Sequence, residues 1–262
     1  MPNEASVLPL VISLPHCSAQ VPPQAAARLA LSPLEVEQSV DLGSREVFGP
    51  LPALKVLPAP QTRLVVDLNR APDDLGPKGV VAAIDYAGRA VFPPGQGPDQ
   101  ALKRRWVESF WRPWHREMAE ALAAPGVRVL LDGHSLDGIG PAEAPDPGAK
   151  RADVVLSNRG GEGGEAAPER GEPTCPPEVF RLLGEALRDQ GLSVAYNTPY
   201  AGGHIIARYG PRLRARGAVA VQMELNKDLY ADLEYSRVYP EKAAELSRVL
   251  NRALSRFLSH RW

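Results

Sequence analysis

The feature of this sequence that most constrains the fold is a series of short apolar runs, each followed at once by polar residues. Val7–Leu14, Val127–Leu131 and Val219–Met223 are rich in aliphatic side chains. Runs of this length and character are typical of strands that are buried on both faces of a sheet. Arg63–Asp67 and Ala152–Leu156 are shorter runs of the same kind and predict two further strands.

Helical patterns separate the apolar runs. Ser32 can cap a helix that starts at Pro33, because Glu35 completes a capping box. Asp99–Leu122 predicts a long helix that carries several aromatic side chains and is kinked or divided by Pro113. Two more helices are expected, from about Pro176 to Gly191 and from Pro240 almost to the C-terminus. Strands that alternate with helices favour an α/β sandwich with a mixed or largely parallel sheet.

Length and charge narrow the possible functions. The chain has 262 residues with no repeat or clear linker, so we expect a single domain over residues 1–262. The formal net charge of −1 gives no general attraction to nucleic acid or to an anionic membrane. The apolar runs are far shorter than the roughly 20 residues that span a bilayer. The oligomeric state does not follow from the sequence.

The expected cellular location follows from the cysteines and the start of the chain. The first residues, Met-Pro-Asn-Glu, lack the basic start of a signal peptide. Cys17 and Cys175 lie far apart, and nothing else in the sequence suggests a disulfide. They are interpreted as reduced thiols, which predicts a cytoplasmic protein.

Polar clusters follow five of the predicted strands. In open α/β sheets, ligands bind outside the carboxyl ends of the strands. If the strands are parallel, these clusters therefore meet at one site. The clusters are Pro15-His16, Asp67-Leu68-Asn69-Arg70, Asp132-Gly133-His134-Ser135, Asn197-Thr198-Pro199-Tyr200 and Glu224-Leu225-Asn226.

Two histidines at strand ends, His16 and His134, indicate a metal site. Imidazole suits zinc, and a catalytic zinc has three protein ligands and one open position. The residues alone leave the third ligand open among Asp41, Asp67, Asp132 and Glu224, of which Glu224 could instead act as a general base. Asp67 and Asp132 could also orient neighbouring side chains. His115 is expected to pack within its helix, and His204 could line a pocket.

Asn69 and Arg70 suggest that the ligand carries a carboxylate. A guanidinium held directly after a buried strand can bind a carboxylate through two hydrogen bonds, and the Asn amide adds a neutral donor. Gly202 and Gly203 follow the Asn197–Tyr200 cluster, and their backbone could approach a ligand closely or simply form a tight turn.

Taken in order, these motifs resemble the N-formylglutamate amidohydrolase family. The resemblance runs from residue 7 to about 235, and it includes Val66–Arg70, Asn197–Gly203 and Gln222–Asn226. That family is similar to the zinc-dependent exopeptidases and aspartoacylase. The resemblance therefore implies a three-layer α/β/α sandwich around a mixed sheet, with Zn²⁺ or another divalent metal as cofactor. It also implies hydrolysis of the amide bond of a small N-formyl or other N-acyl acidic amino acid.

The resemblance also implies roles for particular residues. His16 and His134 correspond to metal ligands, and Glu224 to the general base. Asp41 is predicted as the third ligand, because family members commonly carry an acidic residue in the helix after the first strand. Substrate contacts are expected from one group of residues: Asn69, Arg70, Asn197, Tyr200, Gly202 and Gly203. The chain departs from the family at Cys17-Ser18, where members usually have Ser-Gly, and at Ala19, where exopeptidases carry the glutamate of their His-x-x-Glu pair.

Two other functions stay open. The same scaffold could bind an acidic metabolite without turnover, and bound metal in the purified protein would argue against that. Cys17 could serve a metal-free thiol hydrolase, which would be insensitive to chelators and sensitive to alkylation. A serine hydrolase of the nucleophile-elbow type is disfavoured, since no Gly-x-Ser-x-Gly pattern occurs.

Overall fold

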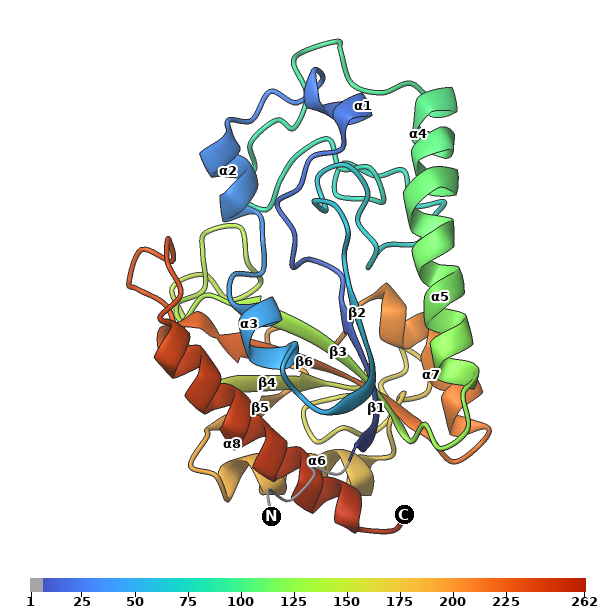
Figure 1. Cartoon of the computed structure of the whole chain (residues 1–262), viewed down its shortest axis with the longest axis vertical. Coiled ribbons are helices and arrows are strands. Elements are labelled where there is room, and N and C mark those ends of the chain that lie inside the picture. Colours follow the sequence, from blue (N-terminus) through green and yellow to red (C-terminus); the bar gives the residue numbers. More distant parts are fainter. Residues whose placement is uncertain (1–6) are drawn as a thin grey trace.

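The computed structural model describes residues 7–262 and has a six-stranded sheet at its centre (Figure 1). The strand order is β2-β1-β3-β6-β4-β5. All neighbouring strands are parallel except β4 and β6, which are antiparallel. The predicted mixed, largely parallel sheet is therefore confirmed. The strands are β1 (Leu8–Leu14), β2 (Ala53–Pro58), β3 (Val129–Leu136), β4 (Val154–Ser157), β5 (Val194–Tyr196) and β6 (Val219–Asn226).

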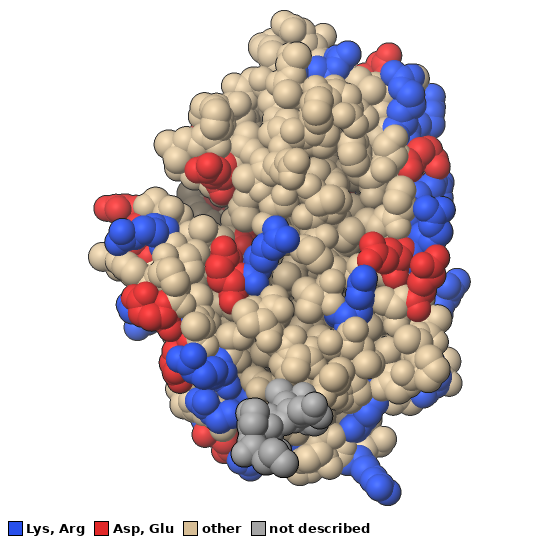
Figure 2. All heavy atoms as spheres, in the orientation of Figure 1, with Lys and Arg blue, Asp and Glu red and all other residues tan. Residues whose placement is uncertain are grey.

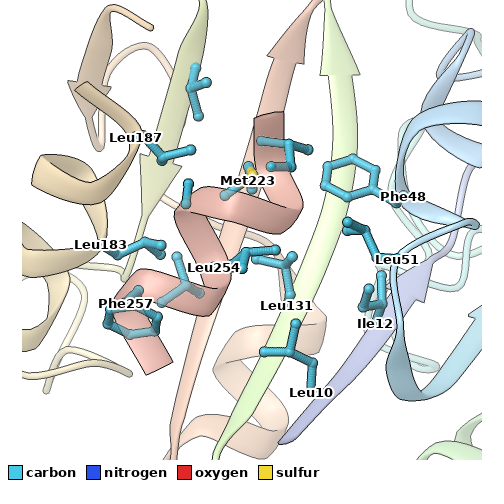
Figure 3. Close-up of a cluster of buried hydrophobic side chains, with 14 of the residues drawn as sticks. Leu10, Ile12, Phe48, Leu51, Leu131, Leu183, Leu187, Met223, Leu254 and Phe257 are labelled. Atoms are coloured by element: carbon cyan, nitrogen blue, oxygen red, sulfur yellow. The ribbon is translucent and has the colours of Figure 1, made fainter. Parts of the chain in front are cut away.

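Helices cover both faces of this sheet. One face packs against α3, α6 and α8, and the other packs against α5 and α7. Figure 3 shows the first of these cores, in which Leu254 and Phe257 of α8 lie over Leu131 of β3 and Met223 of β6. The predicted three-layer α/β/α sandwich is thus confirmed. The α-helices are α1 (Pro23–Ala26), α2 (Pro33–Gln38), α3 (Ser44–Phe48), α4 (Gln100–Trp106), α5 (Arg112–Ala123), α6 (Pro177–Arg188), α7 (His204–Arg214) and α8 (Pro240–Ser259).

The helix starts follow from local sequence. Ser32 caps α2 with the full capping box that the sequence predicts. Asp99 caps α4, and its carboxylate accepts a hydrogen bond from the backbone N–H of Leu102 at 2.7 Å. The long helix is divided as expected, but by a π-helical segment at Val107–Trp111, with Pro113 in the first turn of α5. None of the helices among residues 7–262 is long and apolar enough to cross a membrane.

One predicted strand is wrong. Arg63–Asp67 is a buried turn, and the place beside β1 is taken by β2, an edge strand with Leu54 exposed. The apolar side chains of the turn are buried because the segment lies in a loop-rich region, residues 59–99, which covers part of the second core with α1 and α2 (upper part of Figure 1). The turn brings the Arg63 guanidinium to 2.9 Å from the Asp67 carboxylate.

A second correction concerns strand direction. β4 and β5 run opposite to the other four strands, and β4 lies between β5 and β6. Tyr196, at the carboxyl end of β5, is therefore level with Met223 in the middle of β6 rather than with the carboxyl end of β6. The five polar clusters therefore do not all meet through parallel strand ends. The loop after β5 still comes close to β6, because the N–H of Gly203 donates a hydrogen bond to Gln222 Oε1.

Charged side chains are distributed over the surface without a broad patch of one sign in the view of Figure 2. Lys and Arg side chains lie among Asp and Glu side chains around the rim of this face. This distribution agrees with the formal net charge of −1.

Candidate active site

The candidate site starts from polar side chains on one face of the central strands. In the register of β3 and β6, Asp132 lies opposite Gln222, and His134 lies opposite Glu224. Alternate residues of a strand point to the same face, so these four side chains share one face. The polar residues predicted to follow Leu131 and Met223 in fact belong to the strands, which continue to Leu136 and Asn226. A rigid sheet therefore holds the site.

Three residues form a group that could bind a metal ion. Candidate ligand atoms of His16, Asp41 and His134 all lie within 4.8 Å of one another. Asp41 Oδ2 is 2.8 Å from His134 Nδ1 and 3.4 Å from His16 Nδ1. The backbone fixes Asp41 in this place, because its N–H donates to the carbonyl oxygen of His16 at 3.0 Å. These are the three residues that the sequence analysis selects as metal ligands.

The other ring nitrogens of both histidines face carboxylates. His16 Nε2 is 2.8 Å from Asp67 Oδ1, and His134 Nε2 is 3.0 Å from Asp132 Oδ2. A carboxylate oxygen accepts, so each Nε2 carries the hydrogen and each Nδ1 can present its lone pair to the metal position. Asp67 and Asp132 therefore orient the two imidazoles, which is the alternative role that the sequence left open for them.

The metal position also shows an unsatisfied polar atom. His16 Nδ1 is buried and has no hydrogen-bond partner. A buried nitrogen without a hydrogen-bond partner is unfavourable unless a water molecule or an ion binds it. A divalent metal at this point would accept the lone pair of His16 Nδ1 together with those of Asp41 and His134, and three protein ligands leave an open position. The residues present therefore fit the metal that the family resemblance implies.

Electrostatics also favour positive charge here. Burial disfavours the charged form of His134, but the charges of Asp132 and Glu224 outweigh it and raise its pKa well above the usual range. Burial opposes ionisation of Asp67, but His16 and Arg63 hold the pKa of Asp67 well below its usual range. The carboxylates around the two buried imidazoles therefore make the position between His16, Asp41 and His134 favourable for a cation.

Glu224 lies beside this group with its carboxylate buried. It is 7% exposed, and Gln222 Nε2 donates to its Oε1 at 3.0 Å. Burial raises the pKa of Glu224 above its usual range, and the negative charges of Asp41 and Asp132 add to that effect. A carboxylate with a raised pKa, facing a cavity, has the properties of a general acid or base.

A cavity of about 450 Å³ connects these groups with most of the predicted substrate contacts. Asn69, Arg70, Tyr200, Gly202 and Gly203 line it together with the metal group and Glu224. More basic than acidic side chains line the cavity, which favours an anionic ligand. The basic residues are Arg63, Arg70, Arg151, Arg170 and Lys227, and the acidic ones are Asp41, Asp137 and Glu224.

Asn197 is the one predicted substrate contact that does not line this cavity. Its Oδ1 accepts from the backbone N–H of Asn158 at 2.9 Å, and its Nδ2 donates to the carbonyl oxygen of Gly161 at 2.6 Å. Asn197 Nδ2 also donates to Asn158 Oδ1 at 2.9 Å, so both amide hydrogens are used, which supports a structural role. The cause is the direction of β5, which places Asn197 away from the carboxyl ends of β3 and β6.

Gly203 shows why the loop after β5 needs glycine. Its N–H donates to Gln222 Oε1 at 2.8 Å, and a Cβ atom on it would lie 2.5 Å from Asn69 Nδ2. Asn69 is held tightly as well, because its Oδ1 accepts from Ile205 N at 2.8 Å and its Nδ2 donates to Asp132 at 3.2 Å. Only a residue without a side chain fits between these two contacts.

The segment that carries Asn69 and Arg70 is anchored by the long helix. Trp111 Nε1 donates to the carbonyl oxygen of Arg70 at 3.0 Å, and His115 Nε2 donates to that of Leu68 at 2.9 Å. Trp111 and His115 are one helical turn apart, and their rings stack with centroids 3.7 Å apart. His115 thus packs as predicted, with a supporting function for the site. His204 begins α7 and is not among the residues that line the cavity.

Several residues of the site were missed by the sequence analysis. Arg63 bridges Asp41 and Asp67, at 3.6 Å and 2.9 Å. Its spacing of four residues from Asp67 was the available signal, but it was hidden by the wrong strand prediction. Gln222 could have been found from its alternation with Glu224. Tyr86 and Arg151 lie in loops far away in the sequence, and no local pattern marks them.

The mixed α/β sandwich and the cavity on its sheet, which is lined by imidazoles and carboxylates, assign this chain to the α/β enzymes. Within that class, the chain belongs to the N-formylglutamate amidohydrolase family, whose sequence profile matches residues 8–231. The chain is 28% identical to the N-formylglutamate deformylases of Pseudomonas putida and Pseudomonas aeruginosa, over 94% of this chain and 91% of each relative.

Solved structures agree with this assignment. The structure of N-formylglutamate amidohydrolase from Ralstonia eutropha JMP134 matches with a TM-score of 0.76 and 25% identity, over 98% of this chain and 95% of that chain. A gene product from Agrobacterium tumefaciens shares the fold at 20% identity with a TM-score of 0.62, over 95% of this chain and 91% of that one.

Proposed function

We propose that this protein is a metal-dependent amidohydrolase that cleaves N-formyl-L-glutamate to formate and L-glutamate. One observation carries the proposal: a buried His-Asp-His group and a buried glutamate share a cavity with Asn69 and Arg70. The names of the two Pseudomonas relatives and of the Ralstonia structure support the substrate.

His16, Asp41 and His134 would hold Zn²⁺ or another divalent cation. An ion held there would supply Lewis-acid chemistry: it would lower the pKa of water and polarise the scissile carbonyl. Asp67 and Asp132 hold the two imidazoles in the tautomer that this binding needs. Arg63 balances the charges of Asp41 and Asp67, which keeps both carboxylates ionised in a buried place.

Glu224 would act as the general base. Its carboxylate takes a proton from the attacking water and delivers it to the leaving nitrogen as the C–N bond breaks. Gln222 donates to only one of its oxygens, Oε1, so that Oε2 is available for the water. Asn69 and Arg70 would bind a substrate carboxylate, and Tyr200, Gly202 and Gly203 would complete the substrate wall.

The thiol-hydrolase alternative has little support. Cys17 follows His16, but burial raises the pKa of its thiol, which disfavours the nucleophilic thiolate. Its side chain packs against both apolar cores. A binding protein without turnover would have no need of a buried base such as Glu224 beside the metal group.

The experiment that tests this function is an assay of formate release by the purified protein with added Zn²⁺. N-formyl-L-glutamate should be cleaved, N-acetyl and N-succinyl glutamate more slowly, and chelation should abolish activity that Zn²⁺ then restores. Elemental analysis should find about one divalent metal per chain. Full activity in the presence of a strong chelator, with sensitivity to alkylation, would contradict the proposal and favour Cys17.

We also propose that residues 1–262 act as one catalytic domain, because a single sheet contains strands from Leu8 to Asn226 and α8 packs across it. A cytoplasmic location stays a prediction, with which the free thiols of Cys17 and Cys175 agree.

A further inference from the structure

A second polar group lines the cavity without contacting the metal group. It consists of Tyr86, Tyr200 and Arg151. The hydroxyls of Tyr86 and Tyr200 are hydrogen-bonded to each other, and Arg151 Nη2 lies 3.4 Å from the Tyr200 hydroxyl. Tyr86 belongs to the loop-rich region of residues 59–99, whereas Tyr200 belongs to the loop after β5. The fold therefore brings the two phenols together from distant parts of the chain.

Arg151 is a fixed support for this group. Only 7% of the residue is exposed, and Asp146 binds its guanidinium through two bonds, of 2.9 Å and 2.6 Å. Arg151 Nη1 also donates to the carbonyl oxygen of Asp137 at 3.2 Å. A buried guanidinium held at three points does not move to follow a ligand. It can, however, hold the Tyr200 phenol in place.

Counting hydrogens shows what the group offers to a ligand. Arg151 can only donate, so the Tyr200 oxygen accepts from it. Each phenol has one hydrogen, and only one of the two can lie between the two oxygens. The other hydrogen is left over in a wall of the cavity. Burial raises the pKa of Tyr86 and of Tyr200, so both stay neutral donors at neutral pH.

The basic residues of the cavity show why this donor matters. Arg63, Arg151 and Lys227 are each paired with an aspartate, and Arg170 lies 3.5 Å from Glu169. Among the described residues, Arg70 is the one Lys or Arg lining the cavity that has no carboxylate within 4 Å, and it donates to the carbonyl oxygens of Lys78 and Asn69. The cavity thus has one unpaired cation for a carboxylate, while an N-acyl glutamate carries two carboxylates.

We infer that Tyr86 and Tyr200, positioned by Arg151, form a second carboxylate site, which binds the side-chain carboxylate of the substrate. This inference rests on the proposed function, and it deepens it by making the substrate an N-acyl dicarboxylic amino acid. Arg70 then takes the α-carboxylate, because it follows Asn69, whose Nδ2 is 3.2 Å from His134 Nε2. The α-carboxylate is bonded to Cα, which also bears the nitrogen of the scissile amide. It must therefore lie closer to the metal group than the side-chain carboxylate does.

The test compares two ligands that differ only at the side-chain terminus, N-formyl-L-glutamate and N-formyl-L-norvaline. Binding is measured by calorimetry on zinc-loaded protein in the Glu224→Gln background, where turnover does not interfere. Adding Tyr86→Phe and Tyr200→Phe together should weaken binding of the glutamate derivative on the order of 10- to 100-fold, as for hydrogen bonds to a charged group. Binding of the norvaline derivative should change less than about twofold.

Tyr196→Phe provides the matched control. Its phenol also accepts from an arginine, Arg188, at 2.9 Å, but Tyr196 lies outside the cavity. This variant should bind both ligands as the parent protein does. Circular dichroism checks that each variant is folded.

Three results would overturn the inference: equal weakening for both ligands, no weakening for the glutamate derivative, or no preference of the parent protein for it over the norvaline derivative. Formate release by wild-type protein is measured separately. If the wild type does not cleave N-formyl-L-glutamate but the phenol-dependent preference is found, the proposed reaction fails and the carboxylate site stands.

Discussion

Neighbouring residues of strand β3 point to two faces that differ in character, one apolar and one polar. Leu131 and Gly133 face α3 and α8, where the packing is tight enough that a Cβ atom on Gly133 would lie 2.9 Å from both Leu14 and Phe48. Asp132 and His134 face the cavity side and are buried among polar partners. Because successive side chains of a strand point to opposite faces, the four residues 131–134 contribute both to an apolar core and to the candidate active site. The difference implies that, in this half of the strand, the face with Leu131 and Gly133 determines stability and the face with Asp132 and His134 determines activity.

The largest expected effect is on the polar face. Glu224→Gln keeps the shape and the hydrogen-bonding capacity of the side chain but removes the proton acceptor, so kcat should fall on the order of 10²–10⁴-fold. Metal content and the urea unfolding midpoint should change little. Glu245→Gln, on the exposed surface of α8, is the control and should keep full kcat. A Glu224→Gln enzyme with wild-type kcat would show that another residue is the base.

The opposite face should respond in stability alone. Leu131 is fully buried in the first core, and Leu131→Ala should lower the free energy of unfolding by about 2–5 kcal/mol. The kcat of the fraction that stays folded should be close to wild type. Leu233→Ala removes the same atoms from a side chain that is 92% exposed and should cost almost nothing. If Leu131→Ala lowered kcat as strongly as it lowered stability, the two faces would not be separable.

A smaller effect is expected from the carboxylates behind the imidazoles. Asp67→Asn removes the charge that orients His16, and zinc affinity should fall about 10- to 100-fold. A competition titration with a chelator measures this, with Asp189→Asn on the surface as the control. Unchanged zinc affinity would mean that Asp67 stabilises Arg63 and the local turn and does not contribute to metal binding.

The smallest effect concerns the helix that supports the cavity face. Burial lowers the pKa of His115 to about 3, and the nearby His204 and Arg208 act in the same direction, while its bond to Leu68 opposes them. Because the unfolded ring titrates near 6.5, the neutral ring contributes stability above that pH and loses it as the pH falls. Between pH 6.5 and 5 this group should cost about 1–2 kcal/mol.

Urea unfolding at both pH values measures this effect in wild type and in His115→Gln. Tyr209, whose hydroxyl lies 2.9 Å from His115 Nδ1, is unchanged in the variant. The pH dependence should be weaker in the variant. An identical dependence in both proteins would assign the acid sensitivity to other groups.

Local sequence rules predicted the parts of this fold that depend on local physics. The capping box at Ser32, the helix from Pro240 and the buried strands that lead into His134 and Glu224 are examples. The three residues of the metal group were also anticipated, but Asp41 came from a family resemblance, because nothing in the local sequence distinguishes it from acidic residues that lie on the surface. The strand at Arg63–Asp67 was wrong since burial under loops and burial in a sheet give the same apolar pattern. Asn197 was expected at the cavity but does not line it, because strand direction depends on contacts far apart in the chain. Tyr86 and Arg151 were not found, because such contacts also bring them to the cavity.

The π-helical segment at Val107–Trp111 divides the long helix into two parts that should differ in their tolerance of amino-acid substitutions. Trp111, the last residue of the segment, and His115, one turn further along, donate hydrogen bonds to the carbonyl oxygens of Arg70 and Leu68. The basic surface residues Lys103, Arg104 and Arg105 lie on its N-terminal side, in α4. A π turn holds one more residue than an α turn, so the segment interrupts the regular helix between α4 and the His115 anchor. We therefore expect evolution to vary the exposed residues of α4 more freely than Trp111 and His115, which carry the backbone of the Asn69–Arg70 segment.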